Sequence, residues 1–207
     1  MNPLEEPATT KSRGRPSQYN HKAVLASAMN LFWRNGYGGT SLSDIEAEVG
    51  INRSTLYASF NGKAGLYVAA VDEYINAMEE LLVRPLIEGT QGLEDLVDFV
   101  ESLSARLADP ANPDGCLIVN AMGSGDPPES MDRYMANLRD GFHAGLARAV
   151  ERGEIAAGGL DEKASSLLSS AIGLNVVSKA GGEPEELVRL CRGVASMIDE
   201  WRQPVPA

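Results

Sequence analysis

The stretch TSLSDIEAEVGINRSTLYASFNGK, residues 40–63, concentrates side chains that can bind nucleic acid. Five of them follow one another closely: Asn52, Arg53, Ser54, Thr55 and Tyr57. The guanidinium fork of an arginine matches the O6 and N7 acceptors of guanine, and amides and hydroxyls bond to base edges or phosphates. This pattern predicts a surface that contacts DNA.

Two short helices joined by a tight turn must position these side chains. Ser41 can cap the first helix, with Asp44 as its capping-box partner, and Gly50 suits a left-handed helix end. Asn52 can then cap the second helix. Apolar residues at helical spacing form the buried side of the pair: Leu42, Ile45, Val49, Leu56 and Phe60. The pattern is typical of a helix-turn-helix, whose second helix fits the major groove.

The composition is that of an ordinary globular protein, with 207 residues, 43% hydrophobic and 23% charged. No apolar run approaches the roughly 18 residues that cross a bilayer, and the polar N-terminus does not resemble a signal peptide. Cys116 and Cys191 are too few and too far apart for a disulfide framework. We therefore expect a cytoplasmic protein with no membrane partner.

The net charge of −11 is unevenly distributed along the chain. Residues 11–63 carry seven basic and three acidic side chains, a net charge of +4. Residues 64–207 carry 11 basic and 24 acidic ones, a net charge of −13, and residues 1–10 add −2. A basic N-terminal region on an acidic body suits a protein that must lie on phosphates in one orientation, although uneven surface charge alone would also produce this split.

The chain divides into three parts with a predicted all-α fold of about nine helices. Residues 1–18 are expected to form a flexible basic arm, whose Arg13 and Arg15 could enter a minor groove. Residues 19–63 form the three-helix DNA-binding domain, and residues 64–207 form a larger helical domain. Helical periodicity predicts helices at about 20–35, 61–83, 92–108, 116–122, 129–152, 160–179 and 185–201, besides the two short ones. Arg84-Pro85 is expected to interrupt the helix that ends near residue 83.

The last two predicted helices carry more apolar surface than one helix face needs. Helices of this kind are buried either in the chain's own core or against a second subunit, and both remain open. Pairing with their copies would make a four-helix dimer interface. The residues expected there are Leu168, Ile172, Val176, Leu190, Val194, Met197, Ile198 and Trp201.

The sequence resembles the TetR (tetracycline-repressor) family of bacterial transcriptional regulators over residues 20–67. The matching positions are Ala28, Leu31, Phe32, Gly36-Tyr37, residues 40–45, Val49-Gly50-Ile51, residues 54–60, Lys63 and Leu66. Ala64, where an acidic residue is common, and the Asn61-Gly62 pair depart from the family pattern. Residues 115–120, GCLIVN, resemble one branch in which a Gly-Cys-Leu segment opens the sixth helix.

The resemblance implies DNA-contacting roles at matching positions. At the start of the first short helix, Thr40 and Ser41 would meet a phosphate. Arg53 would read a guanine, and Lys63 would hold a phosphate. The remaining contacts would come from Asn52, Ser54, Thr55 and Tyr57.

The family also implies a homodimeric repressor that leaves a palindromic double-stranded operator when a small hydrophobic effector enters the C-terminal helices. The candidate lining residues of the effector pocket are Met78, Phe99, Leu103, Cys116, Asn120, Tyr134, Met135 and Phe142. Neither a cofactor nor a metal is expected, because the His and Cys residues have no ligand spacing.

Two alternatives remain open. Cys116, at a predicted helix start where the dipole favours a thiolate, could sense oxidants or electrophiles. Cys116 and His143 could instead serve as the nucleophile and base of an enzyme. The sequence supplies neither an orienting third group nor an oxyanion-hole motif for such a pair, so no enzymatic activity is expected.

Overall fold

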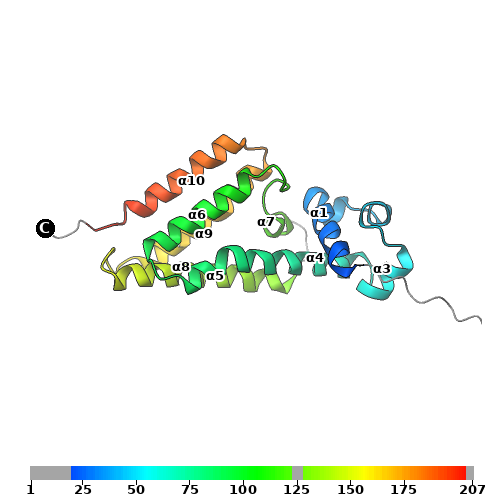
Figure 1. Ribbon diagram of the computed structural model, residues 1–207, viewed down its shortest axis with the longest axis horizontal. Helices are drawn as coiled ribbons and strands as arrows, with labels where there is room; N and C mark the ends of the chain where they lie inside the picture. Colours follow the sequence, from blue (N-terminus) through cyan, green and yellow to red (C-terminus); the bar gives the residue numbers. More distant parts are fainter. Residues whose placement is uncertain (1–19, 123–127, 204–207) are drawn as a thin grey trace, which may run out of the picture.

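The computed structural model describes residues 20–122 and 128–203, and every regular element in those ranges is helical (Figure 1). The elements are α1 (His21–Gly39), α2 (Leu42–Asp44), η1 (Ile45–Val49), α3 (Arg53–Phe60), α4 (Lys63–Met78), η2 (Glu79–Val83), α5 (Arg84–Glu88), α6 (Leu93–Ala108), α7 (Leu117–Ala121), α8 (Glu129–Glu151), α9 (Leu160–Lys179) and α10 (Pro184–Asp199). Since α2 continues into η1, and α4 through η2 into α5, the described ranges hold nine helical stretches. The all-α fold is confirmed; the predicted arm at 1–18 lies outside the described residues.

Helix α1, α2 with η1, and α3 form the group at the right-hand end of Figure 1. The buried face of α1 consists of Val24, Leu25, Ala28, Leu31, Phe32 and Trp33. Regular helix geometry in α1 stops at Gly36, with φ 70° and ψ 169°, so the predicted end at residue 35 is confirmed. Gly50 has φ 76°, a left-handed conformation that lets the chain turn from η1 toward α3.

The segments α4, η2 and α5 form one continuous rod, and the predicted interruption at Arg84-Pro85 is wrong. A proline lacks the backbone N–H and its ring crowds the carbonyl four residues earlier, here that of Leu81. The turn before Pro85 is the π-helical segment η2, which is wider than an α-turn and so accommodates the proline without ending the helix.

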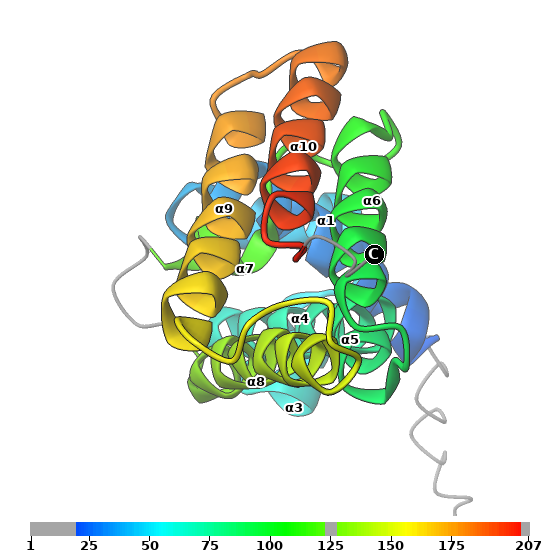
Figure 2. The same ribbon diagram turned by 90° about the vertical axis from the view of Figure 1, so that its left-hand side faces the viewer.

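The larger part of the chain consists of two layers of helices, and the rod lies in one of them. Helices α6, α9 and α10 stand side by side, with α4, α5 and α8 below them (Figure 2). The five-residue helix α7 contacts α1, α4 and α9. It therefore lies where the helix-turn-helix group meets both layers.

One cluster of buried side chains runs from the helix-turn-helix group into the larger helical part. At the junction, Trp33 of α1 meets Tyr74 of α4 edge-on, with ring centroids 4.8 Å apart. The Trp33 indole N–H donates to the Asp114 carbonyl at 3.2 Å. The two parts therefore share one packed interior. No helix in the described ranges is long and apolar enough to cross a membrane.

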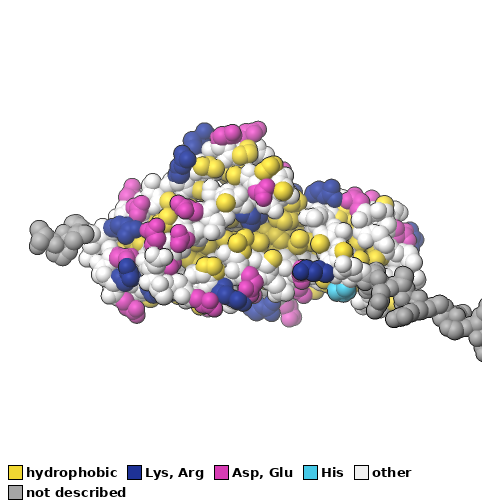
Figure 3. Space-filling view, in the orientation of Figure 1, with side chains coloured by type: hydrophobic (Ala, Val, Ile, Leu, Met, Phe, Trp, Pro, Cys, Tyr) yellow, Lys and Arg dark blue, Asp and Glu magenta, His cyan; other side chains and the backbone are white. Residues whose placement is uncertain are grey.

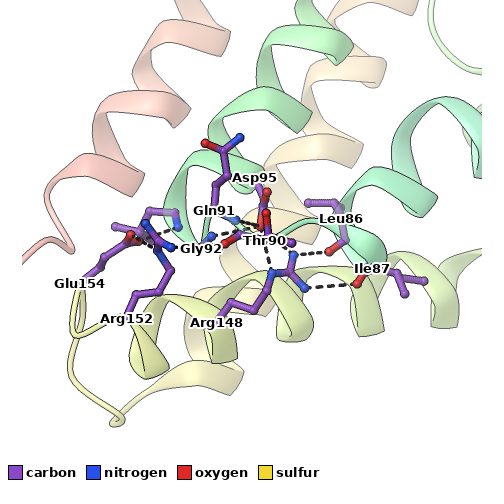
Figure 4. Close-up of polar contacts among 10 residues, drawn as sticks. Leu86, Ile87, Thr90, Gln91, Gly92, Asp95, Arg148, Arg152 and Glu154 are labelled. Carbon is purple, nitrogen blue, oxygen red and sulfur yellow. Dashed lines mark hydrogen bonds and ion pairs between the residues drawn. The ribbon is translucent and has the colours of Figure 1, made fainter.

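A buried ion pair fixes the far end of the rod (Figure 4). From α8, Arg148 donates through Nε to Asp95 Oδ2 at 3.0 Å, and its other nitrogens donate to the carbonyls of Leu86 and Ile87. The same Asp95 oxygen accepts two backbone N–H groups of the turn before α6, each at 3.0 Å. Arg148 thereby satisfies carbonyls left free at the end of α5, which helix geometry cannot pair. The ends of three elements are held at one point.

Two glycines let α8 approach that point closely. A Cβ on Gly141 would lie 3.1 Å from the Leu86 Cβ, and a Cβ on Gly145 would lie 2.8 Å from the Leu96 Cδ2. Real Cβ atoms almost never come within 3.0 Å of another heavy atom. The spacing of α8 from α5 and α6 therefore depends on these missing side chains.

We predict that Arg148→Ala lowers the free energy of unfolding by about 3 kcal/mol, because it leaves the Asp95 carboxylate buried without its cation. The side chains of Arg148 and Asp95 are 18% and 7% exposed. Arg152, 52% exposed and paired with Glu154 on the same turn, is the matched control, and Arg152→Ala should cost less than about 1 kcal/mol. Urea denaturation measures both; equal losses would contradict the anchoring role of Arg148.

The close approach of α3 and α4 gives a second prediction. A Cβ on Gly65 would lie 1.7 Å from the Phe60 carbonyl oxygen, which is backbone and cannot move aside. Gly65→Ala should therefore force the two helices apart and destabilise the protein by about 2 kcal/mol or more. Gly38→Ala is the control, since nothing lies within 4 Å of a Cβ there. Thermal melting compares the two variants, and a wild-type melting temperature for Gly65→Ala would refute the packing described.

Candidate functional site

The first short helix is closed at its start by a complete capping box. The Ser41 N–H donates to Asp44 Oδ2 at 2.7 Å, and the Asp44 N–H donates to Ser41 Oγ at 3.1 Å. The Ser41 N–H, followed by its hydroxyl, holds the pKa of Asp44 below its usual value. Because folding lowers the pKa of Asp44, the capping box stabilises the protein at pH values above the pKa of Asp44 in the unfolded chain. This stabilisation is lost as the pH falls through the pKa of Asp44 in the folded protein. Ser41 itself is exposed.

The amino-terminal end of α3 points its polar side chains outward. Asn52 is the N-cap, and its Oδ1 accepts from the Thr55 N–H at 2.9 Å and from the Ser54 hydroxyl at 2.7 Å. Asn52, Arg53 and Ser54 are exposed, and Thr55 is half-buried. Leu56, buried at 1%, faces the opposite side. Exposed amide, hydroxyl and guanidinium groups gathered at one end of a helix form a surface suited to phosphates and base edges.

Glu46 of η1 holds Arg53 in place. Its carboxylate accepts the Arg53 backbone N–H at 3.2 Å through Oε1 and the Arg53 Nε at 3.3 Å through Oε2. The side chain of Arg53 remains 59% exposed. The ion pair with Glu46 uses Nε, and within the described residues the two terminal nitrogens that form the guanidinium fork remain available for an acceptor pair.

The turn from α3 to α4 presents two more donors. Tyr57 is 58% exposed, and its ring lies against Gly62, where a Cβ would come within 3.1 Å of the ring. Lys63 is the first residue of α4, with Nζ 4.3 Å from the centre of the Tyr37 ring. This cation–π contact restrains the ammonium while leaving it partly exposed.

Thr40 does not share this surface. It is 1% exposed, its hydroxyl donates to the Gly36 carbonyl at 2.8 Å, and its N–H bonds to the Tyr37 carbonyl at 3.4 Å. The expected contact of its hydroxyl with a phosphate is therefore corrected, because both donors already close the turn that follows α1. Arg13 and Arg15 lie outside the described residues.

Charge on the visible face of the larger part is mixed. Figure 3 shows Asp and Glu side chains scattered among Lys and Arg over the C-terminal helices, with hydrophobic side chains gathered near the middle of the face. The C-terminal part carries the excess of acidic groups. Such a body repels phosphates, so a polyanion would be drawn to the helix-turn-helix end.

A small cavity of about 30 Å³ lies among η2, α6, α7, α8 and α9. Its lining residues include five of those expected from the sequence: Phe99, Leu103, Cys116, Tyr134 and Met135. The sequence did not identify the others, which are Leu82, Ile118, Val119, Leu138, Ala171, Ile172 and Asn175. A space of this size holds about one water molecule, so the described state is a closed one.

Three expected lining residues lie elsewhere. Met78 and Phe142 are buried in the core without reaching the cavity, and Phe142 packs edge-on against Phe99 with centroids 4.9 Å apart. Asn120 lines a separate hollow of about 500 Å³ between α1, α7 and α9. These corrections arise because periodicity shows that a residue is buried and does not show whether a void adjoins it.

The two cysteines are free and buried. Cys116 is the N-cap of α7, and its Sγ accepts from the Tyr74 hydroxyl at 3.4 Å. Burial, followed by the neighbouring Cys116, raises the pKa of Tyr74 well above its usual value, so Tyr74 remains a neutral donor. His143 lies 3.6 Å from Asp161, and no contact joins it to Cys116 in the described residues. The structure thus does not assemble the candidate nucleophile and base.

The residues expected at a dimer interface divide between two environments. Val176 and Leu190 are 50% and 40% exposed, and Ile172, Val194, Met197 and Trp201 are half-buried. Leu168 and Ile198, by contrast, face the chain's own core at 7% and 0% exposure. That part of the prediction is corrected, because α10 packs along α6 and α9 and buries one of its stripes within the chain.

Three polar residues of the interior and the surface were not predicted from the sequence. Glu46 could have been suspected from its place seven residues before Arg53 across a turn. Arg106 and Asn175 bond to each other over 69 residues of sequence, at 2.6 Å, and no local pattern indicates such a pair. Both are buried.

Comparison with known proteins agrees with this geometry. The family model described as "Bacterial regulatory proteins, tetR family" matches residues 24–70, which cover α2, η1 and α3, most of α1 and the first half of α4. The HTH-type transcriptional repressor ComR of Escherichia coli (strain K12) is 29% identical, over 87% of this chain and 89% of that protein. The uncharacterized HTH-type transcriptional regulator YezE of Bacillus subtilis (strain 168) is 29% identical, over 84% of this chain and 93% of that protein.

Solved structures share the whole fold. A cysteine mutant of the TetR family transcriptional regulator CifR, complexed with 26bp double-strand operator DNA, superposes with a TM-score of 0.79 at 25% identity, covering 88% of this chain and 98% of that one. A TetR transcriptional regulator from Chloroflexus aurantiacus gives a TM-score of 0.76 at 24% identity, covering 87% and 94%. Residues 24–70 of this chain therefore carry the DNA-binding region of the TetR family of bacterial regulatory proteins, within a chain that is similar along most of its length to HTH-type repressors and TetR regulators.

Proposed function

We propose that the protein is a cytoplasmic homodimeric repressor that holds a palindromic operator through its two α3 helices. The observation that carries this proposal is the exposed amino-terminal end of α3, where Glu46 holds Arg53 through Nε and the Arg53 side chain stays 59% exposed. Arg53 would read a guanine through O6 and N7. Ser41, Asn52, Ser54, Thr55, Tyr57 and Lys63 would contact phosphates and neighbouring base edges.

Homodimerisation is proposed through α9 and α10. Their outward residues include Val176 and Leu190, which are large apolar side chains left exposed in the single chain. Gly173 and Gly193 on the same helices are exposed, with nothing within 4 Å of an added Cβ, so a second copy could approach closely. A two-fold pair would place its α3 helices about 34 Å apart, one turn of DNA.

The effector is proposed to enter the cavity beside Cys116 and to open it. A small-molecule site in proteins measures about 300 Å³ or more, far above the roughly 30 Å³ described. An entering ligand must therefore displace helices that line the cavity, among them η2, the middle of the rod. Because the far end of the rod is anchored, the displacement would move α4 and the attached α3, and would favour an arrangement that does not fit DNA.

We predict that Arg53→Ala weakens binding to a DNA fragment from upstream of the protein's own gene by about 1–3 kcal/mol and relaxes its sequence preference. Lys63→Ala should instead weaken binding to all sequences alike and lower the slope of log K against log salt by about 1. Fluorescence anisotropy across a salt series measures both. A protein that retards no such fragment, or an Arg53→Ala variant with unchanged affinity and preference, would sink the proposal.

A second candidate is a thiol-sensing repressor built on Cys116. The favouring observation is that Cys116 lines the cavity while its Sγ accepts from Tyr74 on α4, so modification of the sulfur would change a contact with the rod itself. A bulkier or oxidised sulfur could not keep that hydrogen bond within the packed interior.

Cys116→Ser decides between the two candidates, with Cys191→Ser as the control. Cys191 is also buried and free but lies on α10, away from the rod. A thiol sensor predicts that hydrogen peroxide or N-ethylmaleimide releases DNA from the wild type and Cys191→Ser, and not from Cys116→Ser. Release that persists in Cys116→Ser rules the thiol out.

A further inference from the structure

Arg106 is a buried cation without an anion. Its side chain lies in the interior with the residue 8% exposed. No carboxylate pairs with it in the described ranges, whereas the half-buried Arg148 has Asp95. An unpaired buried charge is costly, and proteins retain one chiefly where a function uses it.

The hydrogen-bond acceptors of the Arg106 guanidinium in the described residues are neutral oxygens. One terminal nitrogen donates to the Gly115 carbonyl at 3.1 Å, and the other donates to Asn175 Oδ1 at 2.6 Å. The third nitrogen, Nε, is buried and has no acceptor in the described part of the chain. The guanidinium has the planar fork that binds a carboxylate in bidentate fashion, and this nitrogen is still unmatched.

This charge lies at the edge of the cavity beside Cys116. Asn175, its 2.6 Å partner, lines that cavity, as does Leu103, one turn before Arg106 on α6. Burial raises the pKa of Tyr134, another lining residue, and the Arg106 charge counters part of that rise. The cation therefore acts on groups within the cavity, whose remaining wall is largely apolar.

We propose that Arg106 is the anion-binding residue of this cavity, and that the effector is an organic acid with a carboxylate head and an apolar body. The proposal rests on the effector cavity of the proposed function and adds its ligand class. The carboxylate would accept from the Arg106 fork in place of Asn175, and the apolar body would lie among residues such as Phe99, Leu138 and Ile118.

The Arg106 guanidinium also links the cavity to the DNA-binding end. The Arg106 guanidinium lies 5.9 Å from the centre of the Trp33 ring in α1. The Trp33 indole donates to Asp114, next to the Gly115 carbonyl that Arg106 holds. A carboxylate that draws the guanidinium toward the cavity would therefore loosen its hold on residues 114–115 and shift its contact with α1.

Trp33 provides the readout. The sequence has two tryptophans, so Trp201→Phe leaves Trp33, adjacent to Arg106, as the only source of tryptophan fluorescence. The full-length Trp201→Phe protein is titrated with octanoate and its neutral analogue octanamide, and with benzoate and benzamide. In at least one pair the acid should change Trp33 emission and bind at least about tenfold more tightly than the amide, the least that a charge-assisted bond supplies.

Variants assign the preference to Arg106. Arg106→Met should abolish it, so that acid and amide bind within about twofold of each other. Arg84→Met is the control for loss of an exposed arginine, because Arg84 pairs with Glu80 on the rod surface, and should keep the preference. Asn175→Asp tests the same point should Arg106→Met not fold: its carboxylate would occupy the fork and weaken acid binding while sparing the amide.

Three outcomes overturn the proposal: neither acid binds, amides bind as tightly as acids, or Arg106→Met and Asn175→Asp keep the preference. DNA retardation measured in the same solutions separates this proposal from the repressor mechanism. Acid binding that leaves DNA binding unchanged keeps the assignment of Arg106 and contradicts effector-driven release. Release by acid and amide alike keeps the release mechanism and contradicts the role of Arg106.

Discussion

The Arg148–Asp95 ion pair determines how motion can pass through this molecule. It binds the end of α5, the start of α6 and α8 at one point, so the rod formed by α4, η2 and α5 has one fixed end. Its other end begins at Lys63, directly after α3. A rod held at one end amplifies a small displacement near its middle into a larger one at its tip. The helix that would contact DNA is attached to that tip.

The region where the rod could be displaced is also the region where the packing rules are least satisfied. The π-turn η2 ahead of Pro85, the closed cavity, and the unpaired Arg106 all lie in or beside the larger helical part that the rod crosses. By contrast, at the anchored end Arg148 bonds to Asp95 and to the carbonyls of Leu86 and Ile87. Natural chains concentrate such exceptions at functional sites and satisfy the rules elsewhere. The distribution of exceptions therefore agrees with an input at the cavity and an output at α3.

The local features of the fold, namely helix caps, turns and helix bounds, could be predicted from the sequence. The caps at Ser41 and Asn52 and the left-handed Gly50 followed from side chains within a few residues of the backbone groups they satisfy. Helix bounds such as 160–179 followed from periodicity. Partners far apart in sequence did not follow.

Arg148 and Asp95 are separated by 53 positions and Arg106 and Asn175 by 69, so each reads as an ordinary polar residue on its own helix. Ile198 was assigned to a dimer interface for the same reason, since an apolar stripe does not show which helix covers it.

The most direct test is the distance between spin labels attached at Ala58→Cys in the two α3 helices of the homodimer, measured by pulsed electron paramagnetic resonance. With the protein bound to the DNA fragment that it retards, we expect a narrow distribution of label distances near one DNA turn, about 34 Å plus the reach of the labels. Without DNA we expect a broader distribution. No distance between subunits, or the same distribution with and without DNA, would contradict the account.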